Sequence, residues 1–249
     1  MSPRRIPVWL LTGYLGSGKT TLLQQWLRDL ALADAALVVN EIGEVGFDDR
    51  QLASAVDSTR LLSNSCICCS GLPGLEEALT ELWWDRLQRR RPAFSSVVIE
   101  TTGLADPRPI IAAFDTTPFL RERYQLAAVL ACASAPAGAA LLAAQAEARA
   151  QIEAADAVIL TKTDQAPPET LQAEVQGLNP RARVAPSARA SLSWPQLLAL
   201  LLGDGRAATV STPAAHAHHH AATAAFIALP APLSVTALQA RFNDLRGHG

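Results

Sequence analysis

The eight residues at positions 13–20 read Gly13-Tyr14-Leu15-Gly16-Ser17-Gly18-Lys19-Thr20. They fit the pattern G-x-x-x-x-G-K-[ST], and they lie between an apolar stretch at 6–12 and a helical pattern at 19–33, which is the context that this motif requires. Glycines let such a loop curl so that backbone N–H groups and the helix N-terminus surround phosphate oxygens. The sequence therefore predicts a binding site for a nucleoside triphosphate.

Two side chains in this loop have specific predicted roles. Lys19 places a compact positive charge on the β- and γ-phosphates, and the hydroxyl of Thr20 ligates Mg²⁺. Among the 21 basic residues of the chain, only Lys19 and Lys162 are lysines. A lysine retained in so arginine-rich a chain is a candidate for work that arginine cannot do. The other nucleotide contacts predicted here are Gly13, Gly16, Ser17, Gly18 and Thr21.

Apolar stretches and helical patterns alternate along the rest of the chain. Strands are predicted at 6–12, 36–39, 97–99, 126–130, 157–160 and 183–185. Helices are predicted at 19–33, 74–90, 139–154, 168–177 and 194–202. Strands that alternate with helices form βαβ units. We therefore expect an α/β fold of the P-loop NTPase type, with a mostly parallel sheet and helices on both faces.

An acidic residue follows the predicted strand at 97–99. Glu100 comes directly after that strand, and Gly103 stands three residues later. A carboxylate in this place holds Mg²⁺ through water or orients the attacking water, and the backbone N–H of Gly103 donates to the γ-phosphate. We expect Lys19, Glu100 and Gly103 to carry hydrolysis. The plainer interpretation of Glu100 is an exposed acid at the end of a strand.

A second motif, Thr161-Lys162-Thr163-Asp164, follows the predicted strand at 157–160. It resembles the N-K-x-D motif of GTPases, in which the aspartate accepts hydrogen bonds from two N–H groups of guanine and the lysine stem packs along the base. Adenine lacks that pair of donors and would leave the carboxylate without a partner. Thr161 stands where asparagine is commonest. We expect guanine to be bound by Thr161, Lys162 and Asp164.

Three of the four cysteines lie together as Cys66-Ile67-Cys68-Cys69. Three thiolates within four residues can converge on one soft or borderline cation such as Zn²⁺, Co²⁺ or Cu⁺. Three ligands leave one coordination position open, which suits a site that must release its metal. A redox dithiol and a cluster of small buried apolar residues are the alternatives.

Four blocks together resemble the signature motifs of the CobW-type GTPases, P-loop metallochaperones related to the nickel-delivery GTPases. The blocks are residues 13–21, 40–46, 64–69 and 100–107. The resemblance implies that GTP binding and hydrolysis switch a metal site at the cysteine motif, so that zinc or cobalt is loaded in one state and handed to a client metalloenzyme in the other. It also places Glu41 and Glu44 in the first switch segment, in reach of Mg²⁺, the attacking water or the transported metal.

The chain departs from the family pattern at three places. Ser65 replaces the usual glycine before the first cysteine. Cys132 lies in a strand where relatives often carry an aspartate, and we predict that it is a buried core residue. Relatives also carry a full C-terminal α/β domain, whereas this sequence stops after what resembles the first strand and helix of that domain.

These observations predict three parts: a GTPase domain with the metal motif at 1–202, a linker at 203–225, and a remnant of a C-terminal domain at 226–249. The linker contains His216-Ala217-His218-His219-His220. Neutral imidazoles bind Zn²⁺, Ni²⁺ or Co²⁺ with modest affinity. This stretch is therefore either a metal-gathering loop or a polar linker without a ligand role.

Composition excludes several classes of function. The 249 residues carry 21 Lys+Arg against 23 Asp+Glu, which argues against a broad basic face for nucleic acid. No apolar stretch approaches the roughly 18 residues of a membrane span, and the apolar start at 7–11 is interrupted too soon for a signal peptide. We expect a cytoplasmic protein with no nucleic-acid or membrane partner. A homodimer is one assembly that the sequence leaves open.

The expected function is a GTPase that acts as a metal chaperone or insertase. Two alternatives remain open from the residues. One is a regulatory module that senses nucleotide and metal but delivers none. The other is a P-loop kinase or ATPase, which the motif at 161–164 disfavours.

Overall fold

A central sheet of seven parallel strands organises the described part of the chain. The computed structural model describes residues 5–28, 32, 34–41 and 66–203, with the side chains of 40–41 and 66–72 excluded. The strands run in the spatial order β3-β2-β4-β1-β5-β6-β7, and every pairing is parallel. Their bounds are β1 Ile6–Gly13, β2 Ala35–Glu41, β3 Cys66–Ser70, β4 Ser96–Thr101, β5 Tyr124–Ser134, β6 Ala157–Thr161 and β7 Arg183–Ser187.

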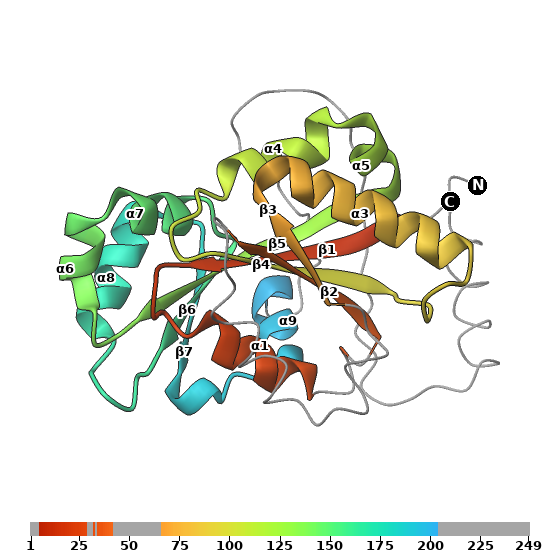
Figure 1. The fold of residues 1–249 in the computed structure, drawn as a ribbon. Coiled ribbons are helices and arrows are strands. Elements are labelled where there is room, and N and C mark those ends of the chain that lie inside the picture. Colours follow the sequence, from red (N-terminus) through yellow and green to blue (C-terminus); the bar gives the residue numbers. More distant parts are fainter. Residues whose placement is uncertain (1–4, 29–31, 33, 42–65, 204–249) are drawn as a thin grey trace, which may run out of the picture. The chain divides into compact units, whose positions relative to one another are not determined.

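Helices cover both faces of this sheet (Figure 1). Their bounds are α1 Lys19–Leu27, α3 Gly71–Leu87, α4 Arg108–Thr116, α5 Pro118–Arg123, α6 Gly138–Ala144, α7 Ala146–Glu153, α8 Glu169–Leu178 and α9 Trp194–Leu202, with a short 3-10 turn η2 at Ala188–Ala190. None of the helices in the described ranges is long and apolar enough to cross a membrane.

Side chains that alternate along the strands divide the core into two layers. On one face, β1, β2 and β4 pack against α3, α4 and α5, while β5 and β6 pack against α6, α7 and α8. On the other face, the alternate residues pack against α1 and α9. Trp26 of α1 and Trp194 of α9 meet there with ring centroids 5.2 Å apart. Because both faces are covered, the central strands are largely apolar, as parallel strands usually are.

The strand order places the candidate motifs together at the carboxyl ends of the strands. The chain first moves outward from β1 to β2 and β3, returns to β4 beside β1, and then continues with β5, β6 and β7 on the other side. Ligands of open α/β sheets bind where the strand order reverses in this way, beyond the carboxyl ends of the strands. The segments after β1, β4, β6 and β7 all begin at these carboxyl ends.

The predicted fold class is confirmed, and the six strands predicted between residues 6 and 185 are present. The single helix predicted at 139–154 is wrong, since Gln145 is extended (φ −118°, ψ 116°) and separates α6 from α7. Alanines dominate this stretch. They do not define a clear apolar face, so the sequence pattern does not reveal where one helix ends and the next begins. The helix predicted at 19–33 is too long, because α1 ends at Leu27 with Arg28 as its C-cap. The sequence did not predict β3, α4 or α5.

The predicted linker and C-terminal remnant lie outside the described residues, beyond Gly203. The same holds for the histidines at 216–220.

Candidate functional site

The loop between β1 and α1 has the tight curl that its glycines predict. Gly16 and Gly18 have φ angles of 70° and 87°, a region that side chains with a Cβ rarely enter. A Cβ on Gly13 would overlap the carbonyl oxygen of Cys132, its register partner on β5. No side chain caps the N-terminus of α1 at Gly18. The loop and the first helical N–H groups can therefore approach an anion closely.

The ammonium group of Lys19 lies inside this curl. Its Nζ donates to the carbonyl oxygens of Gly13 at 2.8 Å and Tyr14 at 3.3 Å, and the residue is only 8% exposed. A compact charge fits between two carbonyls in this way, whereas the planar guanidinium of arginine is larger and donates in a fixed fork.

Thr20 and Glu100 meet across the carboxyl ends of two strands. The Thr20 hydroxyl donates to Glu100 Oε1 at 2.6 Å, and Glu100 is 4% exposed. The register that pairs Glu100 with Leu11 of β1 brings the carboxylate to the phosphate loop. Hydroxyl and carboxylate oxygens are the ligands that Mg²⁺ prefers, so the chemistry of this pair fits that ion.

The segment after β4 touches the phosphate loop through Gly103. A Cβ on this glycine would lie 2.5 Å from the backbone N of Leu15, 2.6 Å from its Cδ2 and 2.8 Å from its Cα. Only glycine allows this approach. The backbone of Gly103 therefore lies directly against the loop that the sequence assigns to phosphate.

The candidate base motif also attaches to this loop. The Thr161 hydroxyl donates to the carbonyl oxygen of Ser17 at 2.6 Å, and Lys162 Nζ donates to that of Gly16 at 2.9 Å. Thr161 is buried, so the residue that departs from the usual asparagine makes the link between β6 and the phosphate loop. The two lysines of the chain thus both donate to carbonyl oxygens of this loop. Lys19 belongs to the motif itself, whereas Lys162 contacts it from the segment after β6.

Asp164 is held by Arg189, which follows β7. The backbone N–H of Arg189 donates to Asp164 Oδ1 at 3.1 Å, and its Nε lies 3.5 Å from Oδ2. Partial burial acts to raise the pKa of Asp164, but the hydrogen bonds and charge of Arg189 outweigh it and keep that pKa below its ordinary value. The carboxylate is therefore ionised at neutral pH and can only accept, as the two N–H groups of guanine require.

Backbone strain collects around this motif. Among the described residues other than glycine, four have a positive φ, and three of them are Lys162 at 56°, Arg189 at 49° and Ala190 at 57°. Such conformations cluster at ligand sites, where surrounding contacts hold them in place. The local strain thus agrees with a binding role for the segments after β6 and β7.

The cysteine motif forms β3, at the edge of the sheet next to β2. In the register, Cys68 pairs with Val39, and Val39 in turn pairs with Glu100. Neighbouring strands lie about 4.8 Å apart, so the backbone of Cys68 is roughly 10 Å from that of Glu100. Glu41, the last residue of β2, pairs with Ser70.

The side chains of the predicted metal ligands at the cysteine motif lie outside the described part of the chain. The side chains of Glu41, Cys66, Cys68 and Cys69 are not among those described, and Glu44 lies outside the described residues altogether. Within the part of the chain that the structure describes, no three His, Cys, Asp or Glu side chains gather as metal ligands would.

The fourth cysteine behaves as predicted. Cys132 is 2% exposed in the core between the sheet, α1 and α9. Burial raises the pKa of its thiol to about 12, so it is not a thiolate at neutral pH. Cys132 is therefore a core residue.

Two residues near the site were missed in the sequence. Arg189 follows the predicted strand at 183–185, and a parallel arrangement would already bring the end of that strand beside Asp164. Gln151 of α7 donates to the carbonyl oxygens of Gly103 and Ala105. No local pattern marks Gln151, because its partners are 48 and 46 residues away.

Comparisons with known proteins find clear relatives of this chain. The description "CobW/HypB/UreG, nucleotide-binding domain" matches residues 7–186. The chain is 41% identical over 180 residues to the zinc chaperone YjiA of Escherichia coli, covering 72% of this chain and 56% of that protein. It is 32% identical over 231 residues to the zinc chaperone CobW of Pseudomonas aeruginosa, covering 79% and 60%. The chain thus spans less than two thirds of these relatives.

Solved structures of related proteins have a similar fold. The crystal structure of Zn(II)-bound YjiA GTPase from E. coli superposes with a TM-score of 0.57 at 36% identity, covering 74% of this chain and 58% of that one. HypB from Helicobacter pylori, solved in complex with nickel, superposes with a TM-score of 0.51 at 20% identity, covering 73% and 78%. The second likeness concerns the fold alone.

Proposed function

Because the chain belongs to the CobW/HypB/UreG family of nucleotide-binding domains, we propose that it binds and hydrolyses GTP and couples the nucleotide state to binding and release of a transition metal. The metal would be Zn²⁺ or Co²⁺, held at the cysteine motif and passed to a client metalloenzyme in the cytoplasm. Relatives named zinc chaperones support this proposal.

The observation that carries the proposal is the meeting of three motifs on one loop. Lys19 lies within the phosphate loop, Glu100 accepts the hydrogen bond of Thr20, and Thr161 is bonded to Ser17. In this assignment Lys19 and the loop amides stabilise charge that develops on the phosphates, and Gly103 donates its N–H to the γ-phosphate. Bound Mg²⁺ would neutralise further phosphate charge. Thr20 would ligate it, and Glu100, with Glu41, would orient water.

The guanine assignment rests on Asp164, and its loss has a defined signature. We expect Asp164→Asn to raise the Kd for GTP about 10- to 100-fold, because the amide cannot replace one charge-assisted hydrogen bond of about 1.5–3 kcal/mol. Inosine triphosphate lacks the exocyclic amine of guanine, so the wild-type preference for GTP over ITP should largely disappear in the variant. Titration of fluorescent nucleotides with competing GTP, ITP and ATP measures both effects.

Asp115→Asn provides the matched control, since Asp115 is an exposed carboxylate of α4 far along the chain from the base motif. It should leave all three affinities unchanged. Equal binding of ATP and GTP by the wild-type protein would contradict the guanine assignment.

The register supports coupling between nucleotide and metal. Cys68, Val39 and Glu100 stand in one row across β3, β2 and β4. A displacement of Glu100 when the γ-phosphate leaves would therefore act within two strand spacings of the cysteine motif. Such order changes around a γ-phosphate are a common switching device.

We expect replacement of Cys66, Cys68 and Cys69 by serine to lower Zn²⁺ affinity at least about 100-fold, because thiolates are the ligands that soft and borderline metals prefer. An anaerobic competition titration against a chromophoric chelator, with a GTP analogue or with GDP bound, measures it. Cys132→Ala is the matched control and should change nothing, since its buried thiol is protonated. Unchanged Zn²⁺ affinity in the triple variant would contradict the metal site, and equal affinity in the two nucleotide states would contradict the coupling.

A further inference from the structure

One glutamine inside the protein fastens α7 to the segment that follows β4. Gln151 is 1% exposed, and its Nε2 donates to the carbonyl oxygens of Gly103 at 3.1 Å and Ala105 at 2.9 Å. Glutamine is mostly a surface residue, and its burial is tolerated when its polar atoms are bonded. Residues 103–105 are thus fixed to α7 by a pair of buried hydrogen bonds.

The same segment is also in close contact with the phosphate loop. A Cβ on Gly103 would lie 2.5 Å from the backbone N of Leu15. The backbone of Gly103 therefore contacts both Leu15 and the carboxamide of Gln151. Because interiors are close-packed, a shift of either neighbour moves this backbone.

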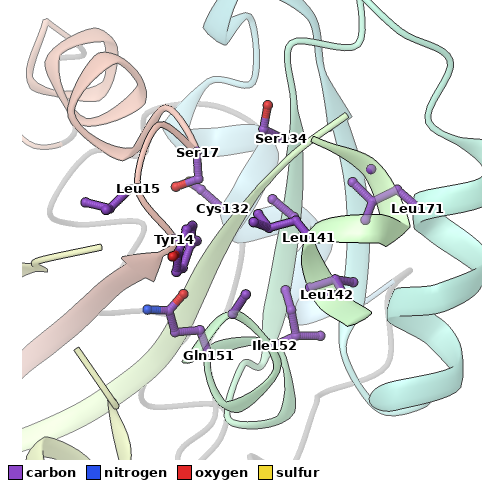
Figure 2. Close-up of a pocket in the computed structure, with 13 residues that line it drawn as sticks. Tyr14, Leu15, Ser17, Cys132, Ser134, Leu141, Leu142, Gln151, Ile152 and Leu171 are labelled. Carbon is purple, nitrogen blue, oxygen red and sulfur yellow. The ribbon is translucent and has the colours of Figure 1, made fainter. Parts of the chain in front are cut away.

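The oxygen of the Gln151 carboxamide faces away from this contact. Carbonyl oxygens only accept hydrogen bonds, so the nitrogen must point to them and Oε1 is turned elsewhere. Oε1 is buried, and none of the described residues donates to it. In Figure 2 it points toward Tyr14, beside a small, partly open pocket that is also lined by Ser17, Leu142 and Ile152. The pocket lies between the phosphate loop and helices α6, α7 and α8.

We propose that Gln151 is a positioning residue that sets where the Gly103 N–H stands relative to the phosphate loop, and so tunes the preference for GTP over GDP. The inference rests on the proposed function, in which that N–H donates to the γ-phosphate. GDP has no γ-phosphate, so the hydrogen bonds of Gln151 favour only the triphosphate state.

Gln151→Met tests this, since methionine has a similar length and no donor. We expect the Kd of a non-hydrolysable GTP analogue to rise about five- to tenfold, as the loss of one or two neutral hydrogen bonds implies. The Kd of GDP should change less than about twofold, and kcat at saturating GTP should fall with the analogue affinity. Titration of both nucleotides and steady-state hydrolysis provide these values.

Two controls separate positioning from stability. Gln176→Met makes the same change on the exposed surface of α8 and should alter neither affinity. Val175→Ala removes packing from the apolar cluster that Ile152 belongs to, without touching residues 103–105. An equal loss for GTP analogue and GDP in Gln151→Met, or the same GTP-selective loss in Val175→Ala, would overturn the proposal.

Hydrogen exchange of the wild-type protein decides the matter if Gln151→Met does not fold. Residues 146–153 of α7 should exchange more slowly with the GTP analogue than with GDP, because the segment that senses the γ-phosphate is bonded to this helix. Equal protection in both states would overturn the inference. If the wild-type protein binds no GTP, the proposed function fails. If it binds both nucleotides and Gln151→Met keeps their affinity ratio, this inference fails alone.

Discussion

Replacing Lys19 by alanine is expected to abolish measurable GTP binding, with a Kd at least about 100-fold higher than that of the wild-type protein. The Nζ atom lies inside the loop, 2.8 Å from the carbonyl oxygen of Gly13 and 3.3 Å from that of Tyr14. Phosphate oxygens that enter this curl would meet a fixed positive charge. Hydrogen bonds to charged groups contribute about 1.5–3 kcal/mol each, and two of them exceed a 100-fold effect.

Lys19→Arg should not restore binding, because the bulkier fork crowds a curl that holds a compact ammonium. Arg28→Ala removes a positive charge just beyond the end of the same helix, from an exposed position, and is the matched control. Fluorescence titration with a labelled GTP measures affinity, and thermal melting verifies that each variant is folded. Binding by Lys19→Ala within tenfold of the wild-type would show that this loop does not hold the phosphates.

Gly103→Ala is expected to lower kcat/KM for GTP hydrolysis at least about 100-fold. The added Cβ would lie 2.5 Å from the backbone N of Leu15 and 2.8 Å from its Cα. Real Cβ atoms do not tolerate such distances to backbone, so either residues 103–105 or the phosphate loop must move. A misplacement of about 1 Å in a catalytic arrangement costs on the order of 100-fold in rate.

Gly177→Ala is the matched control for this change. Gly177 lies in α8, and a Cβ there meets no atom within 4 Å. Alanine should leave turnover unchanged and stabilise the helix by about 0.5–1 kcal/mol, since it restricts the unfolded chain. Steady-state phosphate release and melting temperature record both effects. Full turnover in Gly103→Ala would show that its contact with Leu15 has no part in hydrolysis.

The sequence predicted the elements around the phosphate loop closely, because the motif there constrains the backbone. The strand expected at 6–12 is β1, the glycines of the loop have the left-handed or close-approach conformations that only glycine allows, and the helix expected at 194–202 is α9. The rarity of lysine marked Lys19 and Lys162 as candidates, and their motifs predicted that one contacts the phosphates and the other the base. Both do attach to carbonyl oxygens of the same loop.

Patterns without a strong local constraint were predicted less well. The break at Gln145 falls in an alanine-rich stretch, where helix propensity is high on both sides and the apolar face is hard to identify. The cysteine motif was interpreted as a set of ligands, and its place on a strand at the sheet edge was not foreseen. Its strand, β3, pairs with β2, and that pairing depends on how the rest of the sheet assembles.

Amino-acid sequence alone was enough for the fold class and for the place of the glycine loop between β1 and α1, because each follows from residues close together in the chain. The links among the motifs needed the folded sheet. Thr161 bonds to Ser17 across 144 residues, Thr20 to Glu100 across 80, and Gln151 to Gly103 across 48. Those contacts depend on the order β3-β2-β4-β1-β5-β6-β7, and local hydrophobic patterns are the same for many strand orders. Long-range packing alone selects one of them.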